Sequence, residues 1–194
     1  AKSTWTGTVY IRADGSIDPP DAPIITYDKV TYVLTDNIFS DGDGIIVERD
    51  NIIINGAGHI LQGQEQGVGI DLTQRSNVTV KNVKINAFWY GIWIKSSRNC
   101  TVIKNNVTAN TYDGILVSDS SSNTICGNNM IGNNQYGISV RSSLNNVIIG
   151  NKITGSSRGI YIRKSSNNKV SGNEMIDNGC GIFLDCSLSN IVSN

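Results

Sequence analysis

The chain has 194 residues, and its sixteen basic and sixteen acidic side chains give a formal net charge of zero at neutral pH. A neutral composition with 39% hydrophobic and 16% charged residues excludes a disordered chain and disfavours nucleic acid and anionic lipid, which both select clustered positive charge. No run approaches the about 20 consecutive apolar residues of a transmembrane helix, so we also expect no direct membrane insertion.

Residues 1–43 show two stretches of strand-like composition, at residues 8–16 and 29–39, joined by a Pro-rich link at 18–23. They do not follow the repeat that begins at residue 44, and we expect them to form an N-terminal β capping segment over it. A cap is needed because an open end of stacked strands exposes unpaired N–H and C=O groups. The start at Ala1-Lys2-Ser3 fits a mature N-terminus left after removal of a signal peptide, which predicts an extracellular or cell-surface location.

Residues 44–194 carry an internal repeat marked by a Gly-Ile dipeptide every 22 or 23 residues. The dipeptides begin at Gly69, Gly91, Gly114, Gly137, Gly159 and Gly181. Apolar residues alternate after each dipeptide and are bounded by Asn, Gly and Ser, which is typical of short strands joined by tight turns. We therefore predict an all-β protein: a right-handed, single-stranded parallel β-helix of about seven coils without a C-terminal cap.

Asparagines form two further columns with the same period. The first contains Asn123, Asn146, Asn168 and Asn190, and the second contains Asn105, Asn128, Asn151 and Asn173. Asn tolerates left-handed backbone angles, and its amide can hydrogen-bond to the Asn of the next coil. We expect two structural ladders, the first beginning only at Asn123 because Val78 and Cys100 hold the earlier positions.

Units such as residues 136–153 and 159–175, together with the opening segment 43–63, resemble the parallel β-helix repeats of NosD-like proteins and of the wider carbohydrate-binding and sugar-hydrolase group. The resemblance points to archaeal secreted surface proteins and implies the fold. It leaves activity open, because this architecture hosts lyases, hydrolases, epimerases, binding modules and structural rods. The NosD name also implies copper, but one His, two Met and four scattered Cys form no cluster of soft ligands, so we expect no cofactor and no metal site.

The four cysteines, Cys100, Cys126, Cys180 and Cys186, fall in four different columns of the repeat. A disulfide requires Cα atoms within about 7 Å, so we expect free thiols, with a bond from Cys180 or Cys186 to a neighbouring subunit as the alternative. Three sequons, at Asn77, Asn99 and Asn106, are candidate glycosylation sites that would fit export. Their occupancy is open, because a chain rich in Asn and Thr also forms sequons by chance.

The outward positions of the repeat gather an aromatic and basic strip made of Trp93, Lys95, Arg141, Tyr161, Arg163 and Phe183. Rings of this kind stack on sugars, and cations hold the acidic groups of a polysaccharide. The same residue types are also enriched in protein interfaces, so a ligand and a protein partner both fit. A glycosidase needs two nearby carboxylates, and the best acidic grouping is Glu48, Asp50 and Asp71, in which Glu48 and Asp71 fall on adjacent coils as catalytic candidates. His59, the single histidine, is expected to be a turn residue.

These patterns leave three functions open. The leading hypothesis is a secreted, non-catalytic cell-surface protein that self-associates head to tail as a filament, sheath or coat element, because the repeat stops at Asn194 without a cap. The alternative is a carbohydrate-binding module that uses the aromatic and basic strip. The second alternative is a polysaccharide lyase or hydrolase centred on Glu48 and Asp71, so the sequence leans against an enzyme without excluding one.

Overall fold

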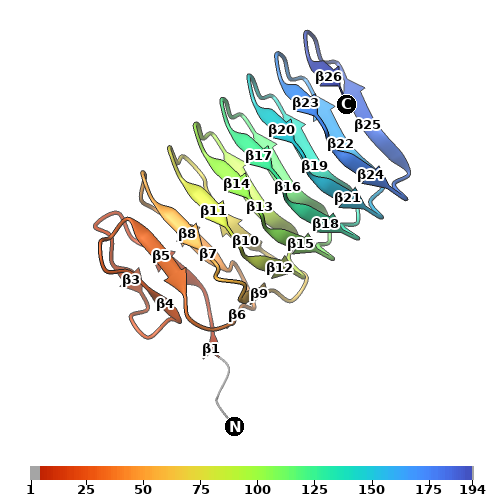
Figure 1. Ribbon diagram of the computed structural model, residues 1–194. Coiled ribbons are helices and arrows are strands. Elements are labelled where there is room, and N and C mark those ends of the chain that lie inside the picture. The colour runs from red at the N-terminus through yellow and green to blue at the C-terminus, as the bar shows by residue number, and fades with distance from the viewer. Residues whose placement is uncertain (1–4, 194) are drawn as a thin grey trace.

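The structure is a computed structural model that describes residues 5–193, and this part of the chain is built only from β-strands and turns. The strands form coils that stack along one axis, with β1 near one end of the stack and β25 and β26 at the other (Figure 1). The predicted parallel β-helix is confirmed. No helix in residues 5–193 is long and apolar enough to cross a membrane.

Three long sheets, which we name A, B and C, form the sides of the described coils. Sheet A contains β1 (Trp5–Thr6), β6 (Ile38–Phe39), β9 (Ile60–Gln62), β12 (Lys84–Asn86), β15 (Asn106–Thr108), β18 (Asn129–Ile131), β21 (Lys152–Thr154) and β24 (Glu174–Ile176). Sheet B contains β3 (Ile17–Asp18), β2 (Val9–Ile11), β7 (Ile45–Val47), β10 (Val68–Asp71), β13 (Tyr90–Lys95), β16 (Asp113–Ser118), β19 (Tyr136–Arg141), β22 (Arg158–Arg163) and β25 (Cys180–Asp185). Sheet C contains β4 (Ile24–Ile25), β5 (Thr31–Leu34), β8 (Ile53–Asn55), β11 (Thr79–Lys81), β14 (Thr101–Ile103), β17 (Thr124–Cys126), β20 (Val147–Ile149), β23 (Lys169–Ser171) and β26 (Ile191–Ser193).

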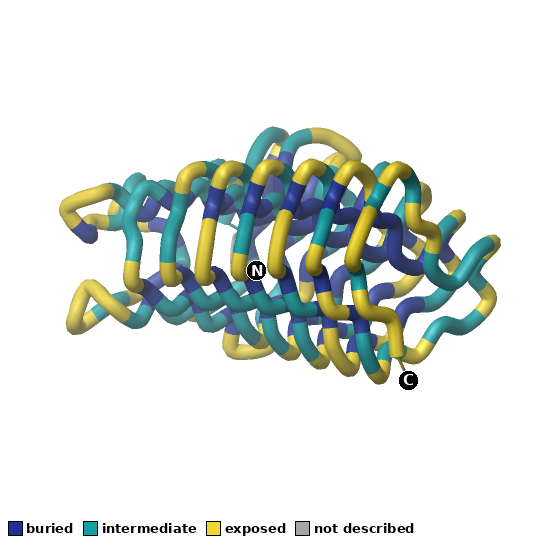
Figure 2. Tube along the Cα trace, turned by 90° about the horizontal axis from the view of Figure 1, so that it is seen from above, coloured by how far each residue is buried: buried dark blue, intermediate teal, exposed yellow. Residues whose placement is uncertain are grey.

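The interior of the coils is filled by stacked aliphatic side chains. In sheet B, Ile92 pairs in register with Ile115, Ile115 with Ile138, and Ile138 with Ile160, and all four are fully buried. Burial follows this inner lining along the molecule, whereas the exposed residues concentrate in the corners between strands (Figure 2). Because alternate strand residues point to opposite sides, the residue that follows each of these isoleucines along its strand points to the outer surface.

The glycine of each Gly-Ile dipeptide allows close contact between coils at the start of the sheet B strands. A Cβ atom added to Gly91 would lie 2.6 Å from the carbonyl oxygen of Gly114, and one added to Gly114 would lie 2.7 Å from that of Gly137. Real Cβ atoms do not approach a backbone oxygen so closely. The repeated glycine of the Gly-Ile dipeptide is therefore explained by the lack of space for a side chain rather than by a catalytic or binding role.

The asparagine columns form continuous ladders of side-chain hydrogen bonds inside the corners. Asn123 donates from its backbone N–H and from Nδ2 to Oδ1 of Asn146, at 2.9 and 3.1 Å, and Asn146 donates in the same way to Asn168. The second column repeats this geometry from Asn105 to Asn128. It continues through Asn151 to Asn173, as the first continues to Asn190. Each amide thus provides an acceptor for a backbone N–H that would otherwise be buried without a partner.

The described residues before position 44 contribute a coil of their own and two short antiparallel strands. β2 pairs in parallel with β7, β5 with β8, and β6 with β9, as in every later coil. Between β2 and β5 the chain makes an excursion in which β3 and β4 pair antiparallel with β2 and β5. The expected capping segment therefore divides into one coil that continues the β-helix and an inserted pair of short strands at its outer edge.

Candidate functional site

The outer surface of five neighbouring sheet B strands, β13, β16, β19, β22 and β25, carries most of the chemistry that the sequence indicates. We call this surface the outer face. Its side chains form three columns that follow the parallel register. The columns are Tyr90, Asp113, Tyr136, Arg158 and Cys180; then Trp93, Leu116, Ser139, Tyr161 and Phe183; then Lys95, Ser118, Arg141, Arg163 and Asp185. All six residues of the predicted strip lie on this face.

Aromatic rings form two groups on the outer face. At one end, Tyr90 contacts Trp93 and Tyr112, with ring centroids 5.4 and 5.5 Å apart. At the other end, Tyr136 stacks on Tyr161 at 4.7 Å, and Tyr161 stacks on Phe183 at 6.0 Å. Phe183 is 40% exposed, but Tyr161 is only 8% exposed. Tyr161 therefore differs from the expectation of a free ring, because neighbouring coils cover both of its faces.

Four cations lie among these rings. Lys95 places Nζ 4.8 Å from the Trp93 ring centroid, and Arg158 lies over Tyr136, Tyr161 and Phe183 at 4.7 to 5.6 Å. Arg163 is exposed and forms an ion pair of 3.3 Å with Asp185. The charged residues of the five strands are four cations (Lys95, Arg141, Arg158, Arg163) and two acids (Asp113, Asp185), a local excess of two positive charges in a neutral chain.

Asp113 lies between the two aromatic groups and is the residue that the sequence reasoning missed. Its carboxylate is completely buried, and Oδ2 accepts hydrogen bonds from Ser139 Oγ at 2.6 Å and from Arg141 Nη2 at 3.0 Å. Its other oxygen, Oδ1, is buried without a partner, as is Nε of Arg141. Burial raises the pKa of Asp113 to about 6, and the bonds from Ser139 and Arg141 only partly oppose that shift.

The acids proposed from the sequence lie on the coils that precede the outer face, and Asp71, the last residue of β10, pairs in register with Trp93 at its edge. Glu48 follows β7 and accepts a 2.8 Å bond from Arg12, whereas Asp71 accepts two bonds from Thr73. In the register, Asp71 lies opposite Ile46 rather than opposite Glu48. Each carboxylate therefore has its own hydrogen-bonding partner, Arg12 for Glu48 and Thr73 for Asp71, and a catalytic role for the two stays a prediction.

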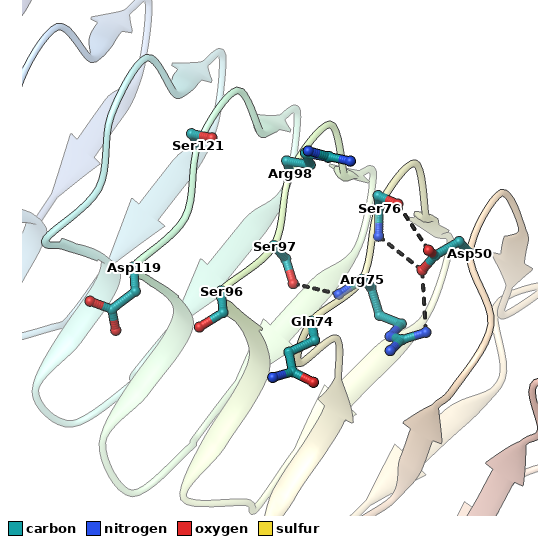
Figure 3. A pocket seen from close by; sticks show the side chains of 9 residues that line it. All are labelled: Asp50, Gln74, Arg75, Ser76, Ser96, Ser97, Arg98, Asp119 and Ser121. Atoms are coloured by element: carbon teal, nitrogen blue, oxygen red, sulfur yellow. Dashed lines mark hydrogen bonds and ion pairs between the residues drawn. The ribbon is translucent and has the colours of Figure 1, made fainter.

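A shallow hollow of about 330 Å³ lies at the corner between sheets B and C, lined by Asp50, Gln74, Arg75, Ser76, Ser96, Ser97, Arg98, Asp119 and Ser121 (Figure 3). The carboxylate of Asp50 in this hollow already has hydrogen-bonding and ion-pair partners within the protein. Asp50 accepts bonds of 3.0 Å from the backbone and hydroxyl of Ser76 and pairs with Arg75 at 3.3 Å (Figure 3). The Asp50 carboxylate of this hollow is therefore already paired with neighbouring protein groups.

The remaining predicted sites are dispersed. All four cysteines have free thiols in the structure, with Cys100 buried and Cys186 exposed. Of the three sequon asparagines, Asn77 and Asn99 are exposed and Asn106 is half-buried in β15. His59 lies in the turn between β8 and β9, as expected for a turn residue. Glycosylation and bonding between subunits stay predictions.

The chain is similar to several known β-helix proteins. A family model described as "Periplasmic copper-binding protein (NosD)" matches residues 24–194. A comparison with curated protein sequences finds no match.

Among solved structures, the enzymatically active domain of tailspike protein 2 from bacteriophage CBA120 has a TM-score of 0.65 and 13% identity, over 84% of this chain and 34% of that chain. The gp42 tailspike of Acinetobacter phage vb_AbaP_AS12 has a TM-score of 0.61 and 12% identity, over 84% of this chain and 39% of that one. The alginate lyase of Paenibacillus sp. str. FPU-7 has a TM-score of 0.51 and 14% identity, over 84% and 78% respectively. At these identities the likeness establishes the fold, and the chain spans little more than a third of either tailspike.

Proposed function

The chain belongs to the NosD family, whose model spans residues 24–194, and on this premise we propose that it is an exported β-helix protein that binds a linear acidic polysaccharide along the outer face. The observation that carries the proposal is the mixture of rings and surplus cations on that face. Aromatic rings supply sugar-stacking surface, and the cations supply attraction for acidic groups. The family description names a periplasmic protein, which agrees with export.

Coil geometry supports a chain-like ligand. Equivalent residues of successive coils are about 4.8 Å apart, which is close to the length of one sugar unit in an extended polysaccharide. A polymer that lies parallel to the β-helix axis would therefore meet a similar set of side chains at each sugar. The name of the alginate lyase guides the choice of probe toward polymers of uronic acids.

Copper, which the family description names, does not fit the residues of this chain. Within residues 5–193, no three His, Cys, Asp or Glu side chains lie close enough together to hold a metal ion. Cys100 is buried with its sulfur 3.5 Å from the Arg98 carbonyl oxygen, and desolvation raises the pKa of its thiol, which disfavours the thiolate that binds soft metals. We therefore assign copper no part in the proposed function.

The test is calorimetric titration with oligogalacturonates of defined length and with a neutral oligosaccharide of the same length. We expect the uronate to bind, and Trp93→Ala and Phe183→Ala to weaken binding by about two- to tenfold each. Tyr27→Ala is the matched control, because Tyr27 is an aromatic residue that is 95% exposed but lies outside the outer face. Absence of uronate binding, or equal loss with Tyr27→Ala, would refute the proposal.

Self-association is a second candidate, and exposed apolar side chains favour it. Leu184 on β25, Leu188 between β25 and β26, and Ile191 and Val192 on β26 are between 41% and 75% exposed. A further coil of a longer chain would cover the same side chains as well as a second copy would, so this candidate ranks below polysaccharide binding. Light scattering distinguishes them: concentration-dependent assembly that Val192→Lys abolishes would support self-association, and a monomer at every concentration would refute it.

A further inference from the structure

Arg141 differs from the other cations of the outer face in the partner that holds it. Arg163 is paired with Asp185, which is partly exposed, and Lys95 and Arg158 lie over aromatic rings. Arg141 is 36% exposed and is held by Asp113, which is completely buried. Its Cζ also lies 5.6 Å from the Tyr136 ring centroid, so the arginine contacts a buried acid and one ring while part of its side chain stays available at the surface.

The pair is also incompletely satisfied. Asp113 Oδ1 is a buried acceptor without a donor, and Arg141 Nε is a buried donor without an acceptor. Two orphan groups within one ion pair indicate that the closed arrangement does not use all the hydrogen bonds that its members can make. A guanidinium binds a carboxylate best through two parallel N–H···O bonds, and only Nη2 contacts Asp113.

We infer that Arg141 binds the carboxylate of a uronic acid unit and that Asp113 is an internal competitor for the same guanidinium. This inference rests on the proposed function and deepens it, because it names the residue that selects the acidic sugar. When Arg141 turns toward the ligand, the ionised Asp113 would be left buried and unpaired, so it takes up a proton. Ligand binding is thereby coupled to protonation of Asp113.

The groups packed around Asp113 leave it as the group that titrates. Tyr90 lies beside it on β13, Tyr112 precedes it, and Tyr136, Ser139 and Arg141 lie on β19. Arg158 of β22 approaches from the far side, with Nη1 3.4 Å from the Tyr136 hydroxyl. Desolvation raises the pKa of Tyr90 above its ordinary value of 10.0, so this phenol stays neutral.

Asp185, the second acid of the outer face, stays ionised because hydrogen bonds from Cys186 and Tyr161 lower its pKa. A uronic acid carboxylate is also ionised throughout the range above about pH 5. The charge that changes near pH 6 is therefore that of Asp113. Above that pH the affinity for uronate should fall by up to about tenfold per pH unit, because each binding event must take up a proton.

The test is calorimetric titration of galacturonate hexamers at about pH 5 and about pH 8 with four proteins. The wild type should bind more tightly at the lower pH. Asp113→Asn should bind tightly at both, because its amide does not compete as a charge, and Arg141→Gln should bind weakly at both. Arg98→Gln is the matched control, since Arg98 is an exposed arginine at the corner hollow outside the outer face.

Two further measurements separate this role from a structural one. Titration in buffers of different ionisation enthalpy should show proton uptake for the wild type above about pH 6 and none for Asp113→Asn. Ser139→Ala removes a bond that lowers the Asp113 pKa, so it should move the midpoint of the pH dependence upward.

The outcomes distinguish the inference from the proposed function. Uronate binding that Trp93→Ala weakens, with the same pH dependence in wild type and Asp113→Asn, overturns the inference and leaves the function intact. Equal pH dependence for a sulfated oligosaccharide overturns the choice of carboxylate. Absence of uronate binding at both pH values overturns both.

Discussion

Single residues of this protein gain their roles from their position on a coil. Asn146 is buried and uses its amide to accept from Asn123 and to donate to Asn168, whereas Asn134 in a corner is exposed. The two residues have the same chemistry, but only the first satisfies buried backbone groups. The stability that each contributes should therefore differ widely.

Replacement of Asn146 by Ala should lower the free energy of unfolding by at least about 2 kcal/mol. The substitution removes the acceptor of the buried backbone N–H of Asn123 and one of the two acceptors of its Nδ2, which still donates to the Ser97 carbonyl oxygen. One orphaned polar group costs about 1–3 kcal/mol. Asn134→Ala should change stability by less than about 0.5 kcal/mol. Urea unfolding followed by circular dichroism measures both, and equal losses would contradict a specific role for the ladder.

Asp113 should make stability depend on pH in a direction opposite to that of most carboxylates. Its folded pKa of about 6 lies above its ordinary value of 3.8, so the folded state binds the proton more tightly than the unfolded state. The cost is absent below the ordinary value, grows as the pH rises toward 6, and is complete above it. The difference between the two values corresponds to at most about 3 kcal/mol.

Asp113→Asn should therefore stabilise the protein at neutral pH and not at about pH 4, because the amide keeps the acceptor for Ser139 and Arg141 without a buried charge. The measurement is the difference in unfolding free energy between variant and wild type across this range. Asp119→Asn, at the exposed corner hollow, is the matched control. A difference that does not change with pH would show that Asp113 is not titrating in the native state.

At the scale of strands and coils, the glycine column sets how closely neighbouring sheet B strands approach. Gly114→Ala should destabilise the fold by about 1–3 kcal/mol or more, because the new Cβ would lie 2.7 Å from the Gly137 carbonyl oxygen and 2.8 Å from Asn133 Nδ2. Gly150→Asn is the control, since Gly150 has φ +64° and open space around it, and Asn tolerates that conformation. Thermal unfolding of the two variants tests the difference.

The coils could be predicted from the sequence because the repeating residues pack against the equivalent residues of the neighbouring coils. Ile92, Ile115 and Ile138 stack in register, so one column of the sequence predicts one row of the core. The alternation of inward and outward residues along each strand likewise predicted the strip from Trp93 to Phe183. The length of each coil and the inner and outer positions were thus open to prediction.

Asp113 and Tyr161 show where sequence reasoning stopped. Asp113 precedes its Gly-Ile dipeptide and so lies outside the alternating residues that predict the outward positions. Its burial arises from Arg141 and Ser139 of the next coil, and the burial of Tyr161 arises from Tyr136 and Phe183. Contacts between particular side chains on different coils have no local pattern. One signal for this site was present in the sequence: aromatic and charged residues alternate in the column of Tyr90, Asp113, Tyr136 and Arg158.

At the scale of the whole molecule, the outer face is a linear array whose length limits how much ligand it can bind. From Trp93 on β13 to Phe183 on β25 there are four coil steps, or roughly 19 Å at about 4.8 Å per step. If each coil meets one sugar, affinity for oligogalacturonates should rise with length up to about five units and then level off. A longer oligosaccharide gains no new contact with the five described strands of the outer face.

Loss of one end of the array should shorten it. Trp93→Ala and Phe183→Ala should each move the plateau to a shorter oligomer, whereas Leu116→Ala, in the same column but 3% exposed, should leave the plateau length unchanged. Tryptophan fluorescence and calorimetry with oligomers of two to eight units provide the measurement. An affinity that does not increase beyond two units would instead indicate a single compact site. In that case Arg141 could still bind the uronate, but the rings at the two ends would contribute nothing, which separates recognition at one point from recognition along the β-helix.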